Sequence, residues 1–185
     1  SLPSWVGELY LETHRGTYTT HGEIKRANRK IELALRDAEI LGALANLQGA
    51  QVDLTPLQSA WSNLLLLQFH DILPGSSIGE VYREAALDHA RIHSTALAVR
   101  DRALGLLAEQ MSTPSQLLLV NSLSWGREDV AQASVPMAGL DWDAPVEIVH
   151  ENGQAAPAQV VSRGETGAVV VFAPRVVPSL GYRGI

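Results

Sequence analysis

The sequence contains no cysteine, only 5% aromatic residues and no long apolar run. Without thiols, neither a disulfide framework nor a thiolate metal site can form. The longest apolar run, Ala168 to Ala173, is far too short to cross a bilayer, as is Leu64 to Leu67, and residues 1–7 lack the basic start and apolar stretch of a signal peptide. The sequence therefore predicts no membrane segment and no membrane partner.

Positive charge is also scarce. Lys and Arg total 14 against 20 Asp and Glu, which gives a formal net charge of −6, and no Lys/Arg-rich run occurs. Because binding to nucleic acid normally requires a basic patch, we expect no nucleic-acid partner. The absence of cysteine and of a signal segment favours a cytoplasmic protein.

Ala and Leu supply most of the apolar content, and the hydrophobic fraction of 46% is ample for a buried core. In three stretches apolar residues recur every three or four positions, which predicts amphipathic helices from about Thr20 to Leu47, Thr55 to His70, and Ser77 to Met111. The pairs at positions 20 and 23 and at 77 and 80 have capping-box spacing. Short turns between the helices predict a three-helix bundle over residues 21–112.

After residue 113 the apolar pattern changes. Short segments rich in β-branched residues, separated by Gly, Pro and Asp, predict strands at 117–120, 130–135, 146–150, 158–161 and 168–172. Strands that follow a run of helices indicate a separate all-β domain, here sandwich-like and spanning 113–185. The predicted fold class is therefore α+β and multidomain, with a helical bundle before a β domain that we expect to be truncated.

One segment, from Gln68 to Ser76, places an imidazole beside a carboxylate at the predicted end of the second helix. His70 has the side chain of a common zinc ligand, and Asp71 could orient a substrate hydroxyl. The alternative is that His70 caps the final helical turn while Asp71 is a solvated turn residue, and the spacing alone favours this alternative. His89 and His93 are also four residues apart on a helix, but apolar neighbours and the lack of a third ligand argue against a zinc site and favour a core position for His89 and a surface position for His93.

A second unusual segment, from Gly7 to Thr20, combines polar, aromatic and charged side chains with two glycines. Segments of this composition often line sites, although the sequence alone slightly favours an ordinary loop packed on the bundle by Tyr10, Tyr18 and Leu11.

Together these segments carry a family resemblance. The sequence Gly7-Glu8-Leu9-Tyr10-Leu11-Glu12, then His14 to Thr20, a basic helix from Lys25, and Gln68-Phe69-His70-Asp71 resemble the α-mannosidases of glycoside hydrolase family 38. The later segments from Val120 to Trp125 and from Pro178 to Tyr182 resemble the start of that family's C-terminal β domain. The resemblance covers almost the whole chain and keeps the family's order.

This resemblance implies a retaining, zinc-dependent α-mannosidase that hydrolyses terminal α-linked mannose in glycans or oligosaccharides. His70 matches a zinc ligand, and Asp71 matches the carboxylate that contacts the metal-bound sugar. The nucleophile and the other ligands belong to the family's N-terminal catalytic domain, which this chain does not contain. Residues 1–20 would lead in from that domain, and we expect the chain alone to lack catalytic residues, activity and stable zinc binding.

A second hypothesis explains the incomplete site differently. The chain could be a non-catalytic module, with the bundle as a docking surface for proteins and the β portion as a carbohydrate-binding domain.

Overall fold

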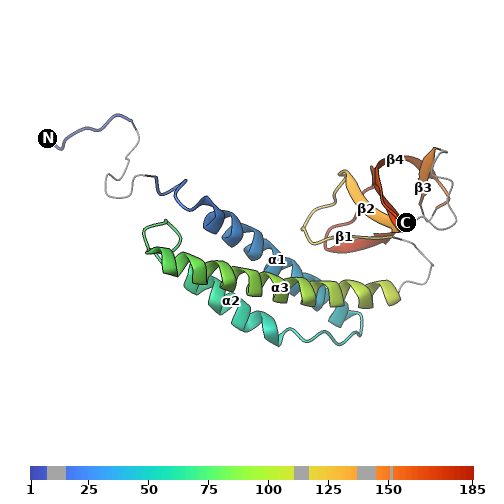
Figure 1. Ribbon diagram of the computed structural model, residues 1–185. Coiled ribbons are helices and arrows are strands. Elements are labelled where there is room, and N and C mark those ends of the chain that lie inside the picture. The colour runs from blue at the N-terminus through green and yellow to red at the C-terminus, as the bar shows by residue number, and fades with distance from the viewer. Residues whose placement is uncertain (8–15, 111–116, 137–144, 151) are drawn as a thin grey trace. The chain divides into compact units, whose positions relative to one another are not determined.

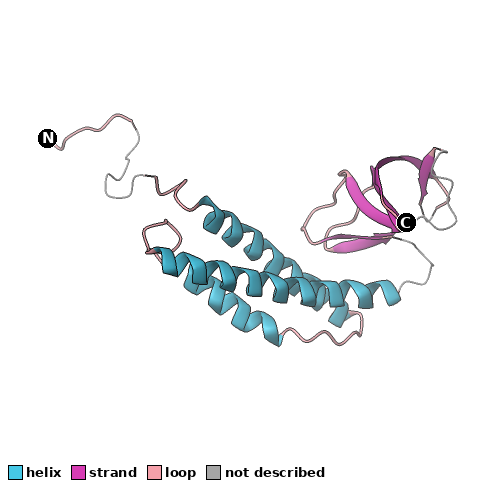
Figure 2. Ribbon diagram, viewed as in Figure 1, coloured by secondary structure: helices cyan, strands magenta, loops and turns pink. Residues whose placement is uncertain are grey.

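The computed structural model of the chain describes residues 1–7, 16–110, 117–136, 145–150 and 152–185. The chain divides into two compact units, Ser1–Leu106 and Leu107–Ile185. The first holds nearly all of the helical residues, and the second holds the strands and the last three residues of the third helix (Figures 1 and 2). The α+β fold class is thus confirmed. The boundary predicted at 112/113 and the predicted helix end at Met111 lie outside the described residues, as do residues 8–15 of the N-terminal motif.

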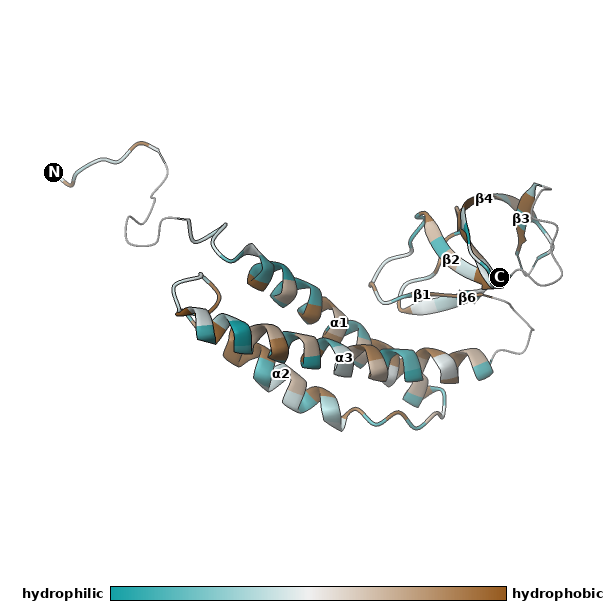
Figure 3. Ribbon diagram, viewed as in Figure 1, coloured by the Kyte–Doolittle hydropathy of each residue, from teal (hydrophilic) through white to brown (hydrophobic). Residues whose placement is uncertain are grey.

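Helix α1 (Gly22–Leu47) is followed by α2 (Thr55–Leu67) and α3 (Gly79–Glu109), and the chain reverses direction between them (Figure 1). All three lie close to the predicted ranges, because an apolar face repeats every three or four residues. Figure 3 shows hydrophobic and hydrophilic residues alternating along each helix. The buried faces carry Ile31, Leu35 and Leu41 from α1, Leu57 and Leu64 from α2, and Ala85, Ile92 and Ala96 from α3.

The predicted helix starts were less accurate. His21 is the N-cap of α1, with φ 49°, and no side chain caps this helix, so the predicted capping box of Thr20 and Glu23 is wrong. Ser77 donates its hydroxyl to the Asp71 carbonyl, at 2.6 Å, two residues before α3 begins. In place of the predicted capping bonds, Glu23 bonds to the His21 ring and Ser77 bonds back to the preceding turn.

The β unit contains two antiparallel sheets. β1 (Leu118–Asn121) pairs with β6 (Gly181–Gly184). A four-stranded sheet has the order β2 (Ala131–Pro136), β5 (Gly167–Phe172), β4 (Ala155–Arg163) and β3 (Val146–Val149). The sequence predicted five of these strands, with β4 too short. It missed β6, whose four residues include two glycines and show no apolar alternation.

Alternate residues of β5 point into the core of this unit. Ala168, Val170 and Phe172 are buried with Ile148 from β3, and partly buried Leu119 from β1 packs against the same cluster. Residues of the small sheet therefore cover one face of the larger sheet, as the sandwich-like prediction requires.

Candidate functional site

His70 and Asp71 lie in the connection between α2 and α3. Helix α2 ends at Leu67 rather than near His70, so the predicted helix was about three residues too long. The following backbone forms successive turns, in which Ile72 and Leu73 donate their N–H groups to the Phe69 carbonyl at 2.9 and 3.0 Å. His70 therefore lies beyond the last helical turn and does not cap it.

The two side chains are adjacent and open to solvent. His70 Nε2 is 3.5 Å from Asp71 Oδ2, and the side chains are 77% and 53% exposed respectively. The imidazole ring also contacts Phe69, with 4.1 Å between ring centroids. An imidazole nitrogen and a carboxylate oxygen thus face solvent together, and both are donor types that zinc accepts.

The main chain of Asp71 is held from α3. Its carbonyl accepts hydrogen bonds from Ser77 Oγ at 2.6 Å and from the Tyr82 hydroxyl at 3.3 Å. The Tyr82 hydroxyl in turn accepts the Ser77 N–H at 2.8 Å. One carboxylate oxygen of Asp71 accepts a hydrogen bond from Ser76 Oγ at 3.2 Å, which orients the side chain.

The same turn is held from the start of α1. Lys25 Nζ donates to the carbonyls of Thr20 at 2.7 Å and Leu73 at 2.9 Å, so one ammonium group joins two segments distant in sequence. Partial burial lowers the pKa of Lys25, with Glu23 opposing that change. Gly75 also packs closely against Thr20. Its φ is 97°, and an added Cβ would lie 2.9 Å from the Thr20 carbonyl oxygen.

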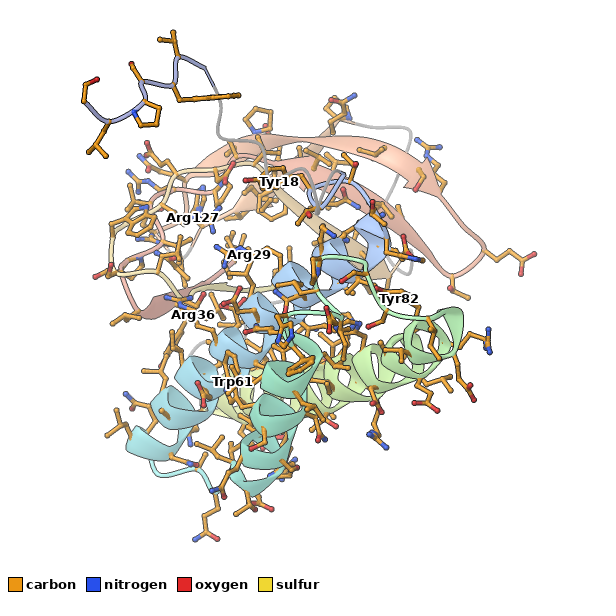
Figure 4. The ribbon with its side chains drawn as sticks, turned by 90° about the vertical axis from the view of Figure 1, so that its left-hand side faces the viewer. Tyr18, Arg29, Arg36, Trp61, Tyr82 and Arg127 are labelled. Atoms are coloured by element: carbon orange, nitrogen blue, oxygen red, sulfur yellow. The ribbon has the colours of Figure 1, made fainter. Side chains whose placement is uncertain are left out.

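His21 and Tyr82 connect α1 to α3 beside this turn. Their rings are stacked with 3.8 Å between centroids, and Figure 4 labels Tyr82 near the start of α3. His21 Nδ1 is 3.0 Å from a carboxylate oxygen of Glu23. The pKa of Glu23 is lowered by a backbone hydrogen bond and by His21. These contacts hold the residues around Asp71 in place and do not involve its carboxylate.

The donor set is incomplete in the described part of the chain. No group of three His, Asp or Glu side chains suited to a metal ion occurs among the described residues. His70 and Asp71 fit a metal–substrate site chemically, but together they could supply only part of its ligands. The described residues also contain no helix long and apolar enough to cross a membrane.

Lys25, Ser77 and Tyr82 were not identified as site residues from the sequence. In the sequence Lys25 is one charge in a basic helix, Ser77 belongs to a predicted capping box, and Tyr82 falls within the third predicted helix. The partners of these side chains lie five to 48 residues away along the chain, so no local pattern marks them. A short Pro-Gly turn between two helices, such as Pro74-Gly75, is the one signal that this connection is constrained.

Comparisons with known proteins agree on one family. The model described as the α-mannosidase middle domain matches residues 12–107. The chain is similar to alpha-mannosidase 2C1 of Homo sapiens, with 42% identity over 137 residues, which are 73% of this chain and 13% of that protein. It is also similar to the alpha-mannosidase of Saccharomyces cerevisiae, with 31% identity over 142 residues, or 75% of this chain and 13% of that protein.

Solved structures show the same fold. The crystal structure of an alpha-mannosidase from Enterococcus faecalis V583 superposes with a TM-score of 0.76 at 18% identity, over 92% of this chain and 24% of that one. The chain spans about 13% of the length of the human and yeast relatives named above.

Proposed function

Because the chain belongs to the α-mannosidase middle domain family, we propose that it forms part of a retaining, zinc-dependent α-mannosidase in which His70 binds the metal and Asp71 binds the mannosyl substrate. The enzyme hydrolyses terminal α-linked mannose in glycans or oligosaccharides and acts in the cytoplasm. The nucleophile, the acid/base carboxylate and the remaining ligands come from an N-terminal catalytic domain outside this chain. The chain alone is inactive.

The observation that carries this proposal is the exposure of an adjacent imidazole and carboxylate on a turn whose backbone is held from two helices. His70 and Asp71 are 77% and 53% exposed, although Lys25 fixes the turn from α1 and Tyr82 fixes it from α3. Ligands held before a metal binds lose little conformational freedom on binding.

Each of the two residues has a separate task. His70 presents an imidazole nitrogen, and the neighbouring Asp71 carboxylate is within 3.5 Å of that ring. Asp71 keeps one oxygen on Ser76 and can turn the other toward a sugar hydroxyl. A zinc ion, when bound, supplies Lewis-acid polarisation of hydroxyl groups and helps to orient the sugar ring.

The test uses the complete α-mannosidase polypeptide that carries this sequence. We expect His70→Gln to lose most bound zinc, as measured by elemental analysis, and to lower hydrolysis of an aryl α-mannoside at least about 100-fold, because one of few ligands is removed. Asp71→Asn should keep more zinc and mainly impair substrate binding. His93→Gln, on α3, is the matched control and should keep both properties.

Full zinc content and normal hydrolysis by His70→Gln would contradict the proposal. Equal zinc loss in His93→Gln would show that any histidine substitution disturbs the fold, and would also argue against a specific role for His70.

A further inference from the structure

A pocket of about 870 Å³ lies at one end of the four-stranded sheet of the β unit. It forms where β2 begins, β5 ends and the hairpin between β3 and β4 turns, because these places are neighbours in the antiparallel sheet. The volume is within the range of small-molecule sites. The polar side chains of the lining come from Glu128, Asp129, His150, Gln154 and Arg175.

His150 is a buried residue of this pocket with an unpaired ring nitrogen. Its backbone is bonded within the hairpin, where its N–H donates to the Gln154 carbonyl at 2.9 Å and its carbonyl accepts the Gly153 N–H at 2.8 Å. The residue is only 5% exposed, and Nδ1 has no hydrogen-bond partner among the described residues. Because buried polar atoms are normally bonded, this nitrogen is suited to receive a ligand that enters the pocket.

Two arginines lie near the His150 ring. Arg175 lines the pocket and makes no hydrogen bond or ion pair with another described residue. Arg183, on β6, has a buried Nε without a partner in the same described ranges. It is directly opposite Leu119, which packs on the cluster that contains Ile148, so Arg183 faces the space between the two sheets. His150 follows Ile148 by two residues and lies on the same face.

The charges of this region favour an anion. Burial lowers the pKa of His150, and Arg175 and Arg183 lower it further, so both guanidinium groups act on the ring. The Asp129 carboxylate is already paired with Arg127 at 2.6 Å. Glu128 has no comparable bond within the described part of the chain. Two guanidinium charges therefore outweigh one free carboxylate.

We infer that this pocket binds a small phosphate ester that carries hydroxyl groups, of the sugar phosphate class. Arg175 and the His150 Nδ1–H donate to phosphate oxygens, and Arg183 adds positive charge beside the ring. Glu128 and Gln154 bond to hydroxyl groups of the same ligand. The inference goes beyond the proposed function and does not depend on it, because its residues all lie in the β unit.

Titration calorimetry of the chain tests the ligand class with inorganic phosphate, glucose 6-phosphate and glucose. Glucose is used in place of mannose so that the result is separate from the proposed mannoside site. We expect both phosphates to bind and glucose 6-phosphate to bind at least about tenfold more tightly, because its hydroxyls add hydrogen bonds. Glucose alone should not bind. Failure of both phosphates to bind, or equal affinity for the two, would overturn the inference.

Substitutions assign the binding to the pocket. Arg175→Gln should weaken binding of glucose 6-phosphate at least about tenfold, because a charged donor to the phosphate is lost. Arg102→Gln, at an exposed position of α3, makes the same change in net charge and is the control. Glu128→Gln should reduce the preference for glucose 6-phosphate over inorganic phosphate. Equal weakening by Arg102→Gln would indicate general charge attraction and would overturn the site.

The role of His150 is tested without replacing this buried residue. In NMR spectra of the histidine rings, inorganic phosphate should shift the resonances of His150 and leave those of His93, which is on α3, in place. Unchanged His150 resonances at saturating phosphate would contradict a bond to its ring.

Hydrogen exchange locates the ligand in the complete α-mannosidase polypeptide. Glucose 6-phosphate should slow exchange several-fold in peptides from the β3–β4 hairpin and from residues 172–178, and Arg175→Gln should remove this protection. Exchange in the peptide of residues 68–76 should stay unchanged. Protection confined to residues 68–76, or none in the β unit, would overturn the inference without affecting the zinc content on which the proposed function is tested.

Discussion

Polar side chains hold two irregular segments of this protein. In one segment the polar residue is buried and bonded, whereas in the other the polar residues stay exposed. In the β unit, Asn121 is only 2% exposed and donates to the carbonyls of Trp125, Val177 and Pro178 while accepting the Leu123 N–H. In the bundle, the turn after α2 is held through its carbonyls, and His70 and Asp71 stay largely exposed. A buried, fully bonded polar residue indicates a structural role, whereas exposed polar residues on a fixed turn indicate a site.

The largest effect should come from removing Asn121. Asn121→Ala removes hydrogen bonds from the carbonyls of Trp125 and Pro178 and from the Leu123 N–H, all at least partly buried, so we expect the β unit to lose about 3 kcal/mol of unfolding free energy. Urea unfolding of the isolated chain, followed by hydrogen exchange of peptides from residues 117–185, measures this loss. Asn152→Ala, at an exposed turn, is the control and should change stability by less than about 0.5 kcal/mol. Similar urea midpoints for the two variants would show that Asn121 has no special structural role in the β unit.

A smaller loss is expected at the bundle turn from Gly75→Ala. The residue has φ 97°, and its new Cβ would clash with the Thr20 backbone, so we expect a cost of about 2 kcal/mol. Gly49→Ala is a matched control, because Gly49 has φ 91° but open space around it. The difference between the two thermal unfolding midpoints isolates the clash with Thr20. If both variants unfold at the same temperature, the turn is not fixed against α1.

Replacing the ammonium group of Lys25 should cost less. Lys25→Met removes two hydrogen bonds to carbonyls but keeps an apolar stem, and water can reach part of this site, so we expect a loss of about 1 kcal/mol. Lys30→Met, at a position without such bonds, controls for the change in charge. Hydrogen exchange of the 68–78 peptide should speed up only in Lys25→Met. Faster exchange in both variants would argue for a charge effect instead of a fixed turn.

The two units should share one pH dependence. Burial lowers the pKa of His89 in the bundle, and burial together with Arg175 and Arg183 lowers the pKa of His150 in the β unit. The unfolded chain therefore binds more protons just below about pH 6.5, the ordinary histidine value. Stability is full above that value and falls as the pH drops toward the lowered values.

His89→Leu should remove the bundle's share of this pH dependence and leave that of the β unit. Unfolding free energies between pH 5 and 7.5, resolved by peptide hydrogen exchange, check this expectation. An unchanged bundle slope in His89→Leu would show that other groups cause it.

The smallest effect is expected at the candidate site itself. Because His70 is 77% exposed and contributes few internal contacts, His70→Ala should change the unfolding free energy of the isolated chain by less than about 0.5 kcal/mol. Calorimetry of the isolated chain measures this difference, with Asn121→Ala as the destabilised reference. A loss above 1 kcal/mol would give His70 a structural role and weaken the contrast with Asn121.

Prediction from the sequence succeeded where a pattern is local and repeated. The apolar faces of α1 and α3 and the run of β-branched residues in β5 were recognised because each depends on residues close together along the chain. The sequence missed β6, because Gly181 to Gly184 pair with β1 about 60 residues away and carry little strand propensity. The roles of His70 and Asp71, and the predicted zinc ion, stay predictions.

The sequence by itself determined the helices, most of the strands, the adjacency of His70 and Asp71, and the family resemblance, because each depends on residues that are close along the chain. Only the tertiary structure decided that Lys25 and Tyr82 hold the turn that carries this pair, and that the buried His150 ring has a nitrogen without a partner among the described residues. These features depend on hydrogen bonds between segments as far apart as Lys25 and Leu73. Such bonds are set by the packing of whole helices, which no local pattern specifies.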